Sequence, residues 1–193
     1  MGDPLEETQC QAEKGLEFAK KWRFGFVVDL ISVQLALVRN LRGLTSSFGS
    51  FNYDEFDEAH FEDHLKTNPV FALPECWYFA RKAQARFLAG NYESAMEASI
   101  KAQRVAWTSP SQFERVELYY YGALSHAACW ESAPHNQKRE HLDSLRSHYK
   151  MFEVWAEHSA ENFENRAALV GAEIARIEER LVDAEGFYEK AIS

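Results

Sequence analysis

The segment from Cys76 to Pro110 constrains the fold more than any other part of the sequence. It reads CWYFARKAQARFLAGNYESAMEASIKAQRVAWTSP, and its apolar and small residues recur every three or four positions, the period of one face of an α-helix. Gly90 and Asn91 interrupt this pattern once, and glycine supplies the backbone freedom that a tight turn needs. Pro110 ends the second half, because proline cannot continue a helix. The segment therefore predicts two antiparallel helices joined by a short turn.

The composition of the whole chain also favours helices. Only 9 glycines and 5 prolines occur in 193 residues, fewer than a turn-rich β fold usually needs. Hydrophobic residues make up 46% and charged residues 26%, which is typical of a globular protein rather than a disordered one. Aromatic residues reach 14%, which suits bulky side chains packed between helices. We therefore expect an all-α fold.

The remaining segments show the same helical period. We expect a single domain over residues 1–193, with N-terminal helices at 4–46, a short acidic helix at 54–67, the clearest hairpin at 75–108, a long hairpin at 111–159 and a last hairpin at 161–193. Gly25 marks the break between the first two helices, and Ser111 with Glu114 predicts a capping box. The chain ends soon after Ala191 without a polar capping helix, which predicts a segment of a longer protein.

Two parts of the sequence match the small-residue positions of a helical repeat of about 34 residues. With Gly90 at the turn, these positions and the aromatic position after the turn hold Ala83, Tyr92, Ala95 and Ala102. In the last hairpin, where Glu179 replaces the turn glycine, the equivalent residues are Ala172, Leu181, Ala184, Tyr188 and Ala191. Small residues let two helices approach closely, and this pattern resembles the tetratricopeptide signature. The resemblance implies antiparallel hairpins stacked as a right-handed α-solenoid.

A longer resemblance covers most of the chain. It is found in the runs FAKKWRFGFVVDLISVQLALVRNLRG, FDEAHFEDHL, CWYFARKAQARFLAGNYESAMEASIKAQ, WTSPSQFERVELYYYGALSHAA and NRAALVGAEIARIEERLVDAEGFYEKAI. They are similar to the helical region of large, mostly bacterial signalling proteins that also contain a Ser/Thr kinase-like domain, an AAA/STAND-type ATPase, GAF or PAS sensors and a histidine kinase. The resemblance implies a non-catalytic protein-interaction or signal-relay module. Kinase and ATPase motifs are absent from this sequence, so those activities do not carry over.

The sequence contains no recognisable catalytic signature, and we expect neither an enzyme nor a bound cofactor. It lacks a P-loop, a G-x-G-x-x-G loop, a G-x-S-x-G elbow and an H-E-x-x-H zinc motif. His60 and His64 lie four residues apart, the spacing of two imidazoles that bind one metal ion, but no third ligand is apparent. A solvated acidic helix explains this pair better. We also expect His141 and His148, which share a helix face, at the surface.

Tetratricopeptide arrays bind extended peptides along a concave face lined by the first helix of each hairpin. The residues expected there are Trp77, Gln84, Phe87, Tyr119, His126, Arg166 and Arg176. Aromatic anchors beside arginines suit a peptide with apolar and acidic groups. Aromatic residues at helical spacing also fit the core of a closed bundle. An alternative function is a small-molecule sensor with an apolar cavity lined by Trp77, Tyr119 or Trp155.

The charge of the chain limits its partners. A formal net charge of −9 disfavours nucleic acid, so we expect a protein or peptide partner, or other domains of the same polypeptide. No apolar run approaches the roughly 18 residues of a membrane helix, and the N-terminus lacks the pattern of a signal peptide, so we expect no membrane partner. Three widely spaced cysteines favour a reducing cytoplasm. An aromatic face exposed by truncation of a longer protein would favour an artificial homodimer.

Overall fold

The structure is a computed structural model that describes residues 3–192, and over these residues the chain is all-helical, as predicted. This range contains nine α-helices and no β-strand, and the helices are α1 (Leu5–Lys21), α2 (Gly25–Leu41), α3 (Glu58–Leu65), α4 (Ala72–Leu88), α5 (Tyr92–Arg104), α6 (Phe113–Trp130), α7 (His135–His158), α8 (Ala160–Ile177) and α9 (Leu181–Ile192). Two short 3-10 turns, η1 (Pro69–Phe71) and η2 (Ala106–Thr108), precede α4 and follow α5. The chain divides into two compact units, an N-terminal unit that extends to Leu118 and a C-terminal unit that begins at Tyr119.

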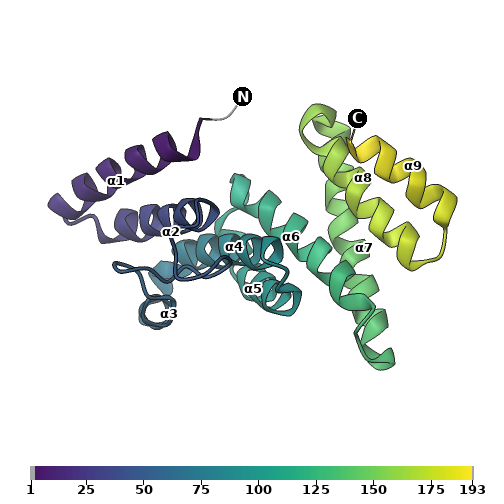
Figure 1. The fold of residues 1–193 in the computed structure, drawn as a ribbon, viewed down its shortest axis with the longest axis horizontal. Helices are drawn as coiled ribbons and strands as arrows, with labels where there is room; N and C mark the ends of the chain where they lie inside the picture. The colour runs from purple at the N-terminus through teal and green to yellow at the C-terminus, as the bar shows by residue number, and fades with distance from the viewer. Residues whose placement is uncertain (1–2, 193) are drawn as a thin grey trace. The chain divides into compact units, whose positions relative to one another are not determined.

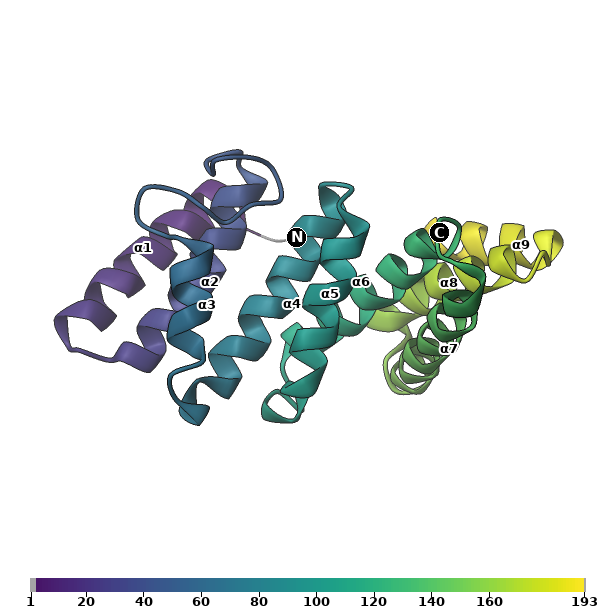
Figure 2. The same cartoon turned by 90° about the horizontal axis from the view of Figure 1, so that it is seen from below.

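In the N-terminal unit, α2 packs against both α1 and α4, and α4 packs against α5 (Figure 1). Figure 2 shows the hairpins α1–α2 and α4–α5, and the long loop that leads from α2 to α3. Helix α4 contributes Tyr78, Ala80 and Ala83 to the core, and all three are fully buried. Val33 of α2 and Phe51 of the loop are buried in the same cluster. The other elements of this unit therefore assemble around α4.

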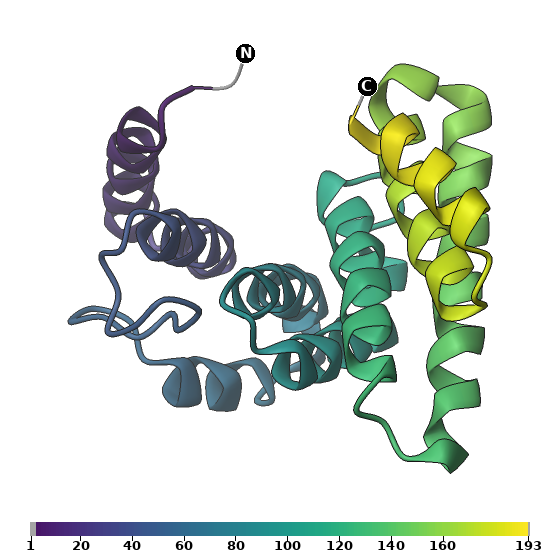
Figure 3. The same ribbon diagram turned by 45° about the vertical axis from the view of Figure 1, so that its right-hand side comes forward.

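In the C-terminal unit, α8 packs against both α7 and α9 (Figure 3). Small residues on α8 make these approaches close, and Ala168, Ala172 and Ala175 are all buried. A Cβ atom at Gly171 would lie 3.1 Å from Cε2 of Tyr149, so the tyrosine ring of α7 lies directly against the α8 backbone. Because the side chains at a contact set the distance between helices, these small residues fix the spacing of the three helices.

Over residues 3–192, four helices end with the same backbone turn. At the end of α4 the Gly90 N–H donates to the Phe87 carbonyl (2.9 Å) and the Asn91 N–H donates to the Arg86 carbonyl (2.9 Å), the two bonds of a Schellman motif. Helices α1, α2 and α8 end with equivalent pairs of bonds. The residues in the left-handed position of the four turns are Arg23, Gly43, Gly90 and Glu179.

The equivalence of Gly90 and Glu179 agrees with the two sequence frames. The φ angle is 77° at Gly90 and 60° at Glu179, so the glutamate adopts the backbone conformation of the turn glycine that it replaces. The small positions before and after the two turns are also buried, at Ala83, Ala95, Ala102, Ala172 and Ala184. The sequence frames therefore align residues that have the same local structure.

Two helix boundaries near the N-terminus differ from those expected. The first break falls at Arg23, where the backbone becomes left-handed, and Gly25 already begins α2. The acidic helix α3 begins only after Asp57, because the Asp57 side chain accepts the His60 N–H (2.7 Å) and caps the helix there. Helix α3 is therefore shorter than the acidic segment that predicted it.

The expected capping box at the start of α6 is also replaced by another contact. Helix α6 begins at Phe113 rather than Ser111, and the Glu114 carboxylate pairs with the Arg81 guanidinium of α4 (2.7 Å). Arg81 is only 8% exposed and also donates to Gln34 Oε1 of α2 (2.9 Å). The side chain that was expected to cap α6 therefore joins the start of α6 to α4.

We expect Gly49→Ala to destabilise the N-terminal unit more than Gly43→Ala does. Both glycines have positive φ angles, 92° and 71°, so either substitution adds about 1–2 kcal/mol of backbone strain. A Cβ atom at Gly49 would also lie 2.6 Å from the Cβ atom of Ala89, whereas nothing lies within 4 Å of one at Gly43. Overpacking of this kind adds about 1–3 kcal/mol. Hydrogen exchange of the α4 amides, measured at increasing urea concentration, gives the loss in the free energy of unfolding for each variant. Equal losses in the two variants would contradict this prediction.

Candidate functional site

The residues predicted to line a peptide groove fall into two groups, one in each unit. In the N-terminal unit, Trp77, Gln84 and Phe87 lie half-buried on α4. The Trp77 Nε1–H donates to Ser109 Oγ (3.1 Å), and the Phe87 ring lies 5.3 Å from the Tyr92 ring. Trp77 and Phe87 therefore make contacts inside the unit, and the part of all three residues in peptide binding stays a prediction.

The groove residues of the C-terminal unit are Tyr119, His126, Arg166 and Arg176. The Arg166 guanidinium lies 5.0 Å from the centre of the Tyr120 ring, and the Arg176 guanidinium pairs with Glu131 (2.6 Å). His126 is only 6% exposed and lies inside the unit. The binding role of this group also stays a prediction.

The turn between α1 and α2 exposes large apolar side chains. Phe18, Trp22 and Phe24 are 60%, 57% and 52% exposed. Basic residues alternate with them, and we define the α1–α2 turn surface as Phe18, Lys20, Lys21, Trp22, Arg23, Phe24, Phe26 and Val27. The run KKWRFGF, which interleaves basic and aromatic residues beside a predicted helix break, was the sequence signal for this surface.

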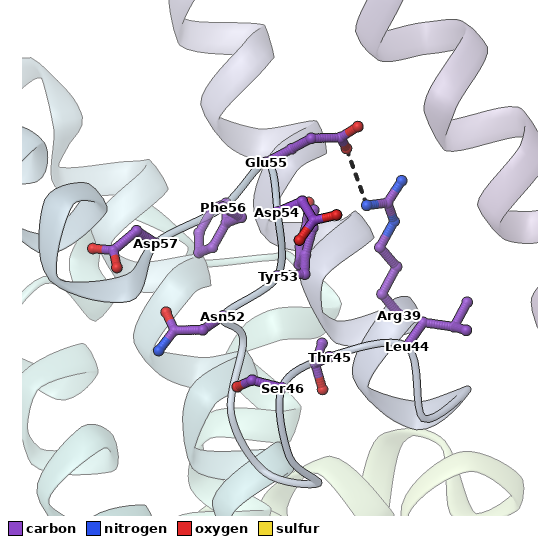
Figure 4. A pocket seen from close by; sticks show the side chains of 10 residues that line it. All are labelled: Arg39, Leu44, Thr45, Ser46, Asn52, Tyr53, Asp54, Glu55, Phe56 and Asp57. Atoms are coloured by element: carbon purple, nitrogen blue, oxygen red, sulfur yellow. Dashed lines mark hydrogen bonds and ion pairs between the residues drawn. The ribbon is translucent and has the colours of Figure 1, made fainter.

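The loop of residues 42–57 borders a cavity of about 710 Å³ that the sequence did not indicate (Figure 4). The Arg39 guanidinium of α2 lies 4.3 Å from the centre of the Tyr53 ring and pairs with Glu55 (3.0 Å) and with Glu13 of α1 (2.9 Å). The other polar side chains of the lining are Thr45, Ser46, Asn52, Asp54 and Asp57. Because the Arg39 charge is neutralised within the chain, the cavity presents mainly carboxylate, amide and hydroxyl groups.

A buried ion-pair cluster attaches the loop and α3 to α4. The Glu58 carboxylate accepts hydrogen bonds from the Phe51 N–H (2.6 Å), the Lys82 ammonium (2.5 Å) and the Arg86 guanidinium (2.9 Å). Lys82 also pairs with Glu62 (2.6 Å). Burial raises the pKa of the Glu58 carboxyl, but the Lys82 and Phe51 donors outweigh burial, so its pKa lies below the ordinary value. The carboxylate is therefore ionised at neutral pH and is engaged in structural contacts.

Three buried histidines lie between α6 and α7, although two of them were expected at the surface. His141 and His148 are 7% and 3% exposed. The Nδ1 atoms of His126 and His141 lie 3.2 Å apart, and the His126 ring lies 5.8 Å from the His148 ring. Burial lowers the pKa of His126 to about 3 and that of His148 to about 4, and it also lowers the pKa of His141. The three imidazoles are therefore neutral at pH 7.

His60 and His64, the pair considered above as metal ligands, lie on α3 and are not part of the buried histidine cluster. His60 is exposed, and His64 Nε2 lies 3.1 Å from the Asp29 carboxylate. Over residues 3–192, no group of three or more His, Cys, Asp or Glu side chains is placed to hold a metal ion. Over the same residues, no helix is both long and apolar enough to cross a membrane.

No protein-family model, curated protein or solved structure matches the chain.

We expect Glu58→Ala to destabilise the N-terminal unit strongly. Removing one member of a buried ion pair costs about 3–5 kcal/mol, because Lys82 and Arg86, both partly buried, lose the carboxylate that compensates them. The matched control is Asp63→Ala, which removes the exposed Asp63–Lys66 pair (2.9 Å) and should cause no measurable loss. Hydrogen exchange of the Phe51 amide measures the local effect, and equal protection in both variants would show that Glu58 does not hold the loop.

We expect the C-terminal unit to lose stability in acid. The folded-state pKa values of His126 and His148, about 3 and about 4, lie below the ordinary value of 6.5, so the unfolded chain binds more protons as the pH falls below 6.5. The contribution of the two neutral histidines to the free energy of unfolding is fully present above pH 6.5. As the pH falls below 6.5, the free energy of unfolding decreases by up to about 1.4 kcal/mol per pH unit for each histidine. Urea unfolding at several pH values between 7 and 4.5, with Trp155 fluorescence as the probe, measures the slope of the free energy of unfolding against pH.

Two substitutions separate the buried histidines from other acid-sensitive groups. His148→Gln should reduce the slope, whereas His158→Gln, at an exposed position, should leave it unchanged. The same slope in both variants would remove His148 as its source.

Proposed function

We propose that the chain is a non-catalytic protein-interaction module built from tetratricopeptide-like hairpins of a right-handed α-solenoid. The observation on which this depends is the α1–α2 turn surface, where Phe18, Trp22 and Phe24 are each more than half exposed. Contiguous apolar patches on soluble proteins commonly mark interaction sites. Aromatic residues, Trp and Tyr above all, also tend to dominate the binding energy of protein interfaces. The α1–α2 turn surface is therefore our leading candidate for the contact with a partner.

The repeat character of the proposal has support from local structure. Gly90 and Glu179 occupy the same position of two equivalent turns, and the alanines of both sequence frames except Ala191 are buried. Stacked helical hairpins create extended surfaces that serve binding rather than catalysis. The groove residues on α4 of the N-terminal unit, and separately those on α6 and α8 of the C-terminal unit, are further candidate contacts of the same module.

We place the module in the cytoplasm, as an arm of a bacterial signalling protein whose other domains carry kinase and ATPase activity. This setting follows from the sequence resemblance. The partner would then be another protein, another domain of the same polypeptide or a second copy of the chain. Signal relay in such a protein needs contacts between domains, and exposed aromatic side chains supply them.

Small-molecule sensing is a second candidate function, and the loop cavity favours it. Its volume of about 710 Å³ falls within the range of about 300–1,000 Å³ that is usual for ligand sites. It lies beside the loop of residues 42–57 rather than next to Trp77, where the sequence had placed a sensor cavity. A lining rich in carboxylate and amide groups would suit a small cationic or hydroxylated ligand.

Selection from a random peptide display library tests the proposed interaction module. We expect peptides enriched on the chain to bind Trp22→Ala at least about 10-fold more weakly, because truncating a central aromatic anchor removes much of the binding energy. Trp107→Ala is the matched control, since Trp107 is 74% exposed in η2 of the same unit but lies outside the α1–α2 turn surface. A failure to enrich any peptide, or unchanged binding by Trp22→Ala, would contradict the role of this surface.

A further inference from the structure

A hollow of about 380 Å³ lies beside the α1–α2 turn surface and shares residues with it. Lys20, Arg23 and Phe26 contribute to the lining from the turn, and Phe71 contributes from η1. The hollow is thus bounded by apolar rings and by two long cationic side chains. Its volume is near the lower end of the range of about 300–1,000 Å³ for ligand sites, which suits a bulky side chain of a partner.

The hollow has a formal net positive charge, because its lining holds two basic residues, Lys20 and Arg23, and one acidic residue. Among the lining residues only Asp29 is acidic, and it is 9% exposed with its carboxylate 3.1 Å from His64 Nε2. The Asp29 carboxylate is therefore largely buried and hydrogen-bonded to His64, so it is not available to a ligand. The charged groups that remain for a ligand are those of Lys20 and Arg23.

Three cations at this turn have no carboxylate partner in the part of the chain that the structure describes. Lys20, Lys21 and Arg23 form no ion pair among residues 3–192, whereas Arg39 and Arg81 each contact a glutamate. They lie within four consecutive residues of a chain whose net charge is −9. A local excess of positive charge on an acidic protein gives the surface a preference for acidic groups.

The backbone conformation of Arg23 is a second indication that its side chain has a functional role. Its φ angle is 58°, in the left-handed region where glycine is favoured, and the equivalent position at the other three helix ends holds Gly43, Gly90 and Glu179. Residues that keep an unfavourable backbone conformation cluster at functional sites. An arginine here projects its charge from the turn at the expense of local stability.

We propose that the α1–α2 turn surface binds an acidic protein segment in which a bulky apolar side chain is flanked by carboxylates. The apolar side chain enters the hollow beside Phe26 and Phe71, and the carboxylates pair with Lys20, Lys21 and Arg23. This inference rests on the proposed function, because it names the partner chemistry of the same surface. A concave hollow accommodates a side chain better than a flat bilayer surface, and the net charge of −9 opposes both an anionic membrane and a second copy of the chain.

Three peptide libraries test this partner chemistry. Each displays a fixed Leu-Phe core, and the flanking positions are restricted to Asp and Glu, to Ser and Gly, or to Lys and Arg. We expect enrichment on the chain in the order acidic, neutral, basic, with acidic binding weakened when salt rises from about 50 to about 300 mM. The triple variant K20E/K21E/R23E should reverse this order. The matched control K14E/R104E/R139E makes the same change in net charge at exposed positions elsewhere and should preserve the order.

Arg23→Gly separates binding from stability. Glycine relieves the left-handed strain, so the N-terminal unit should melt at a higher temperature than that of the parent. The loss of one exposed ion pair should nevertheless weaken acidic peptide binding by about twofold to fivefold. Unchanged binding in this variant and in K20E/K21E/R23E would overturn the proposal.

The outcomes distinguish failure of this inference from failure of the proposed function. If Trp22→Ala abolishes binding but the three libraries enrich equally, the surface binds proteins through apolar contacts alone and the acidic partner is wrong. If no library binds, the interaction module itself fails. The last experiment is sedimentation of the chain with vesicles of phosphatidylserine and phosphatidylcholine. Vesicle binding that is lost in Trp22→Ala would show that the surface binds a membrane rather than an acidic protein segment, and would overturn the proposal.

Discussion

The buried carboxylate of Glu58 is the interaction on which the N-terminal unit depends most. The loop of residues 42–57 lacks regular secondary structure, so its buried polar groups need partners from elsewhere. Glu58 accepts the Phe51 N–H, its own N–H donates to the Asn52 amide oxygen (2.7 Å), and Lys82 of α4 compensates its charge. One residue thereby connects the loop, α3 and α4. The cavity of Figure 4 has its present form because the loop is held in this way.

Charge has two different uses in this unit. Inside the unit, Arg39, Arg81 and Lys82 lie beside carboxylates, and such pairs specify which segments meet more than they add net stability. At the α1–α2 turn, Lys20 and Arg23 project from a helix end without such compensation. The contrast separates cations that define the fold from cations that remain for a partner. It also explains why an acidic chain can still present a positive binding surface.

The α1–α2 turn surface was difficult to predict because its aromatic residues have the spacing of a core. Phe18 and Trp22 lie four residues apart, as core residues of a helix do. Helix α1, however, packs mainly against α2, so residues turned away from α2 stay exposed. The groove residues came from the repeat frames instead, which locate positions along a helix but not the contacts that Trp77 or Arg176 make there.

The sequence by itself determined the helices and the turns between them, because helical periodicity and the preference of glycine for left-handed backbone are local properties. It identified the turn at Gly90 and its counterpart at Glu179. Only the tertiary structure decided that His148 is buried and that Glu114 pairs with Arg81 instead of capping its own helix. Burial and ion pairing depend on which helix faces pack together. Residues distant in sequence decide that packing, so the local pattern around each residue does not reveal it.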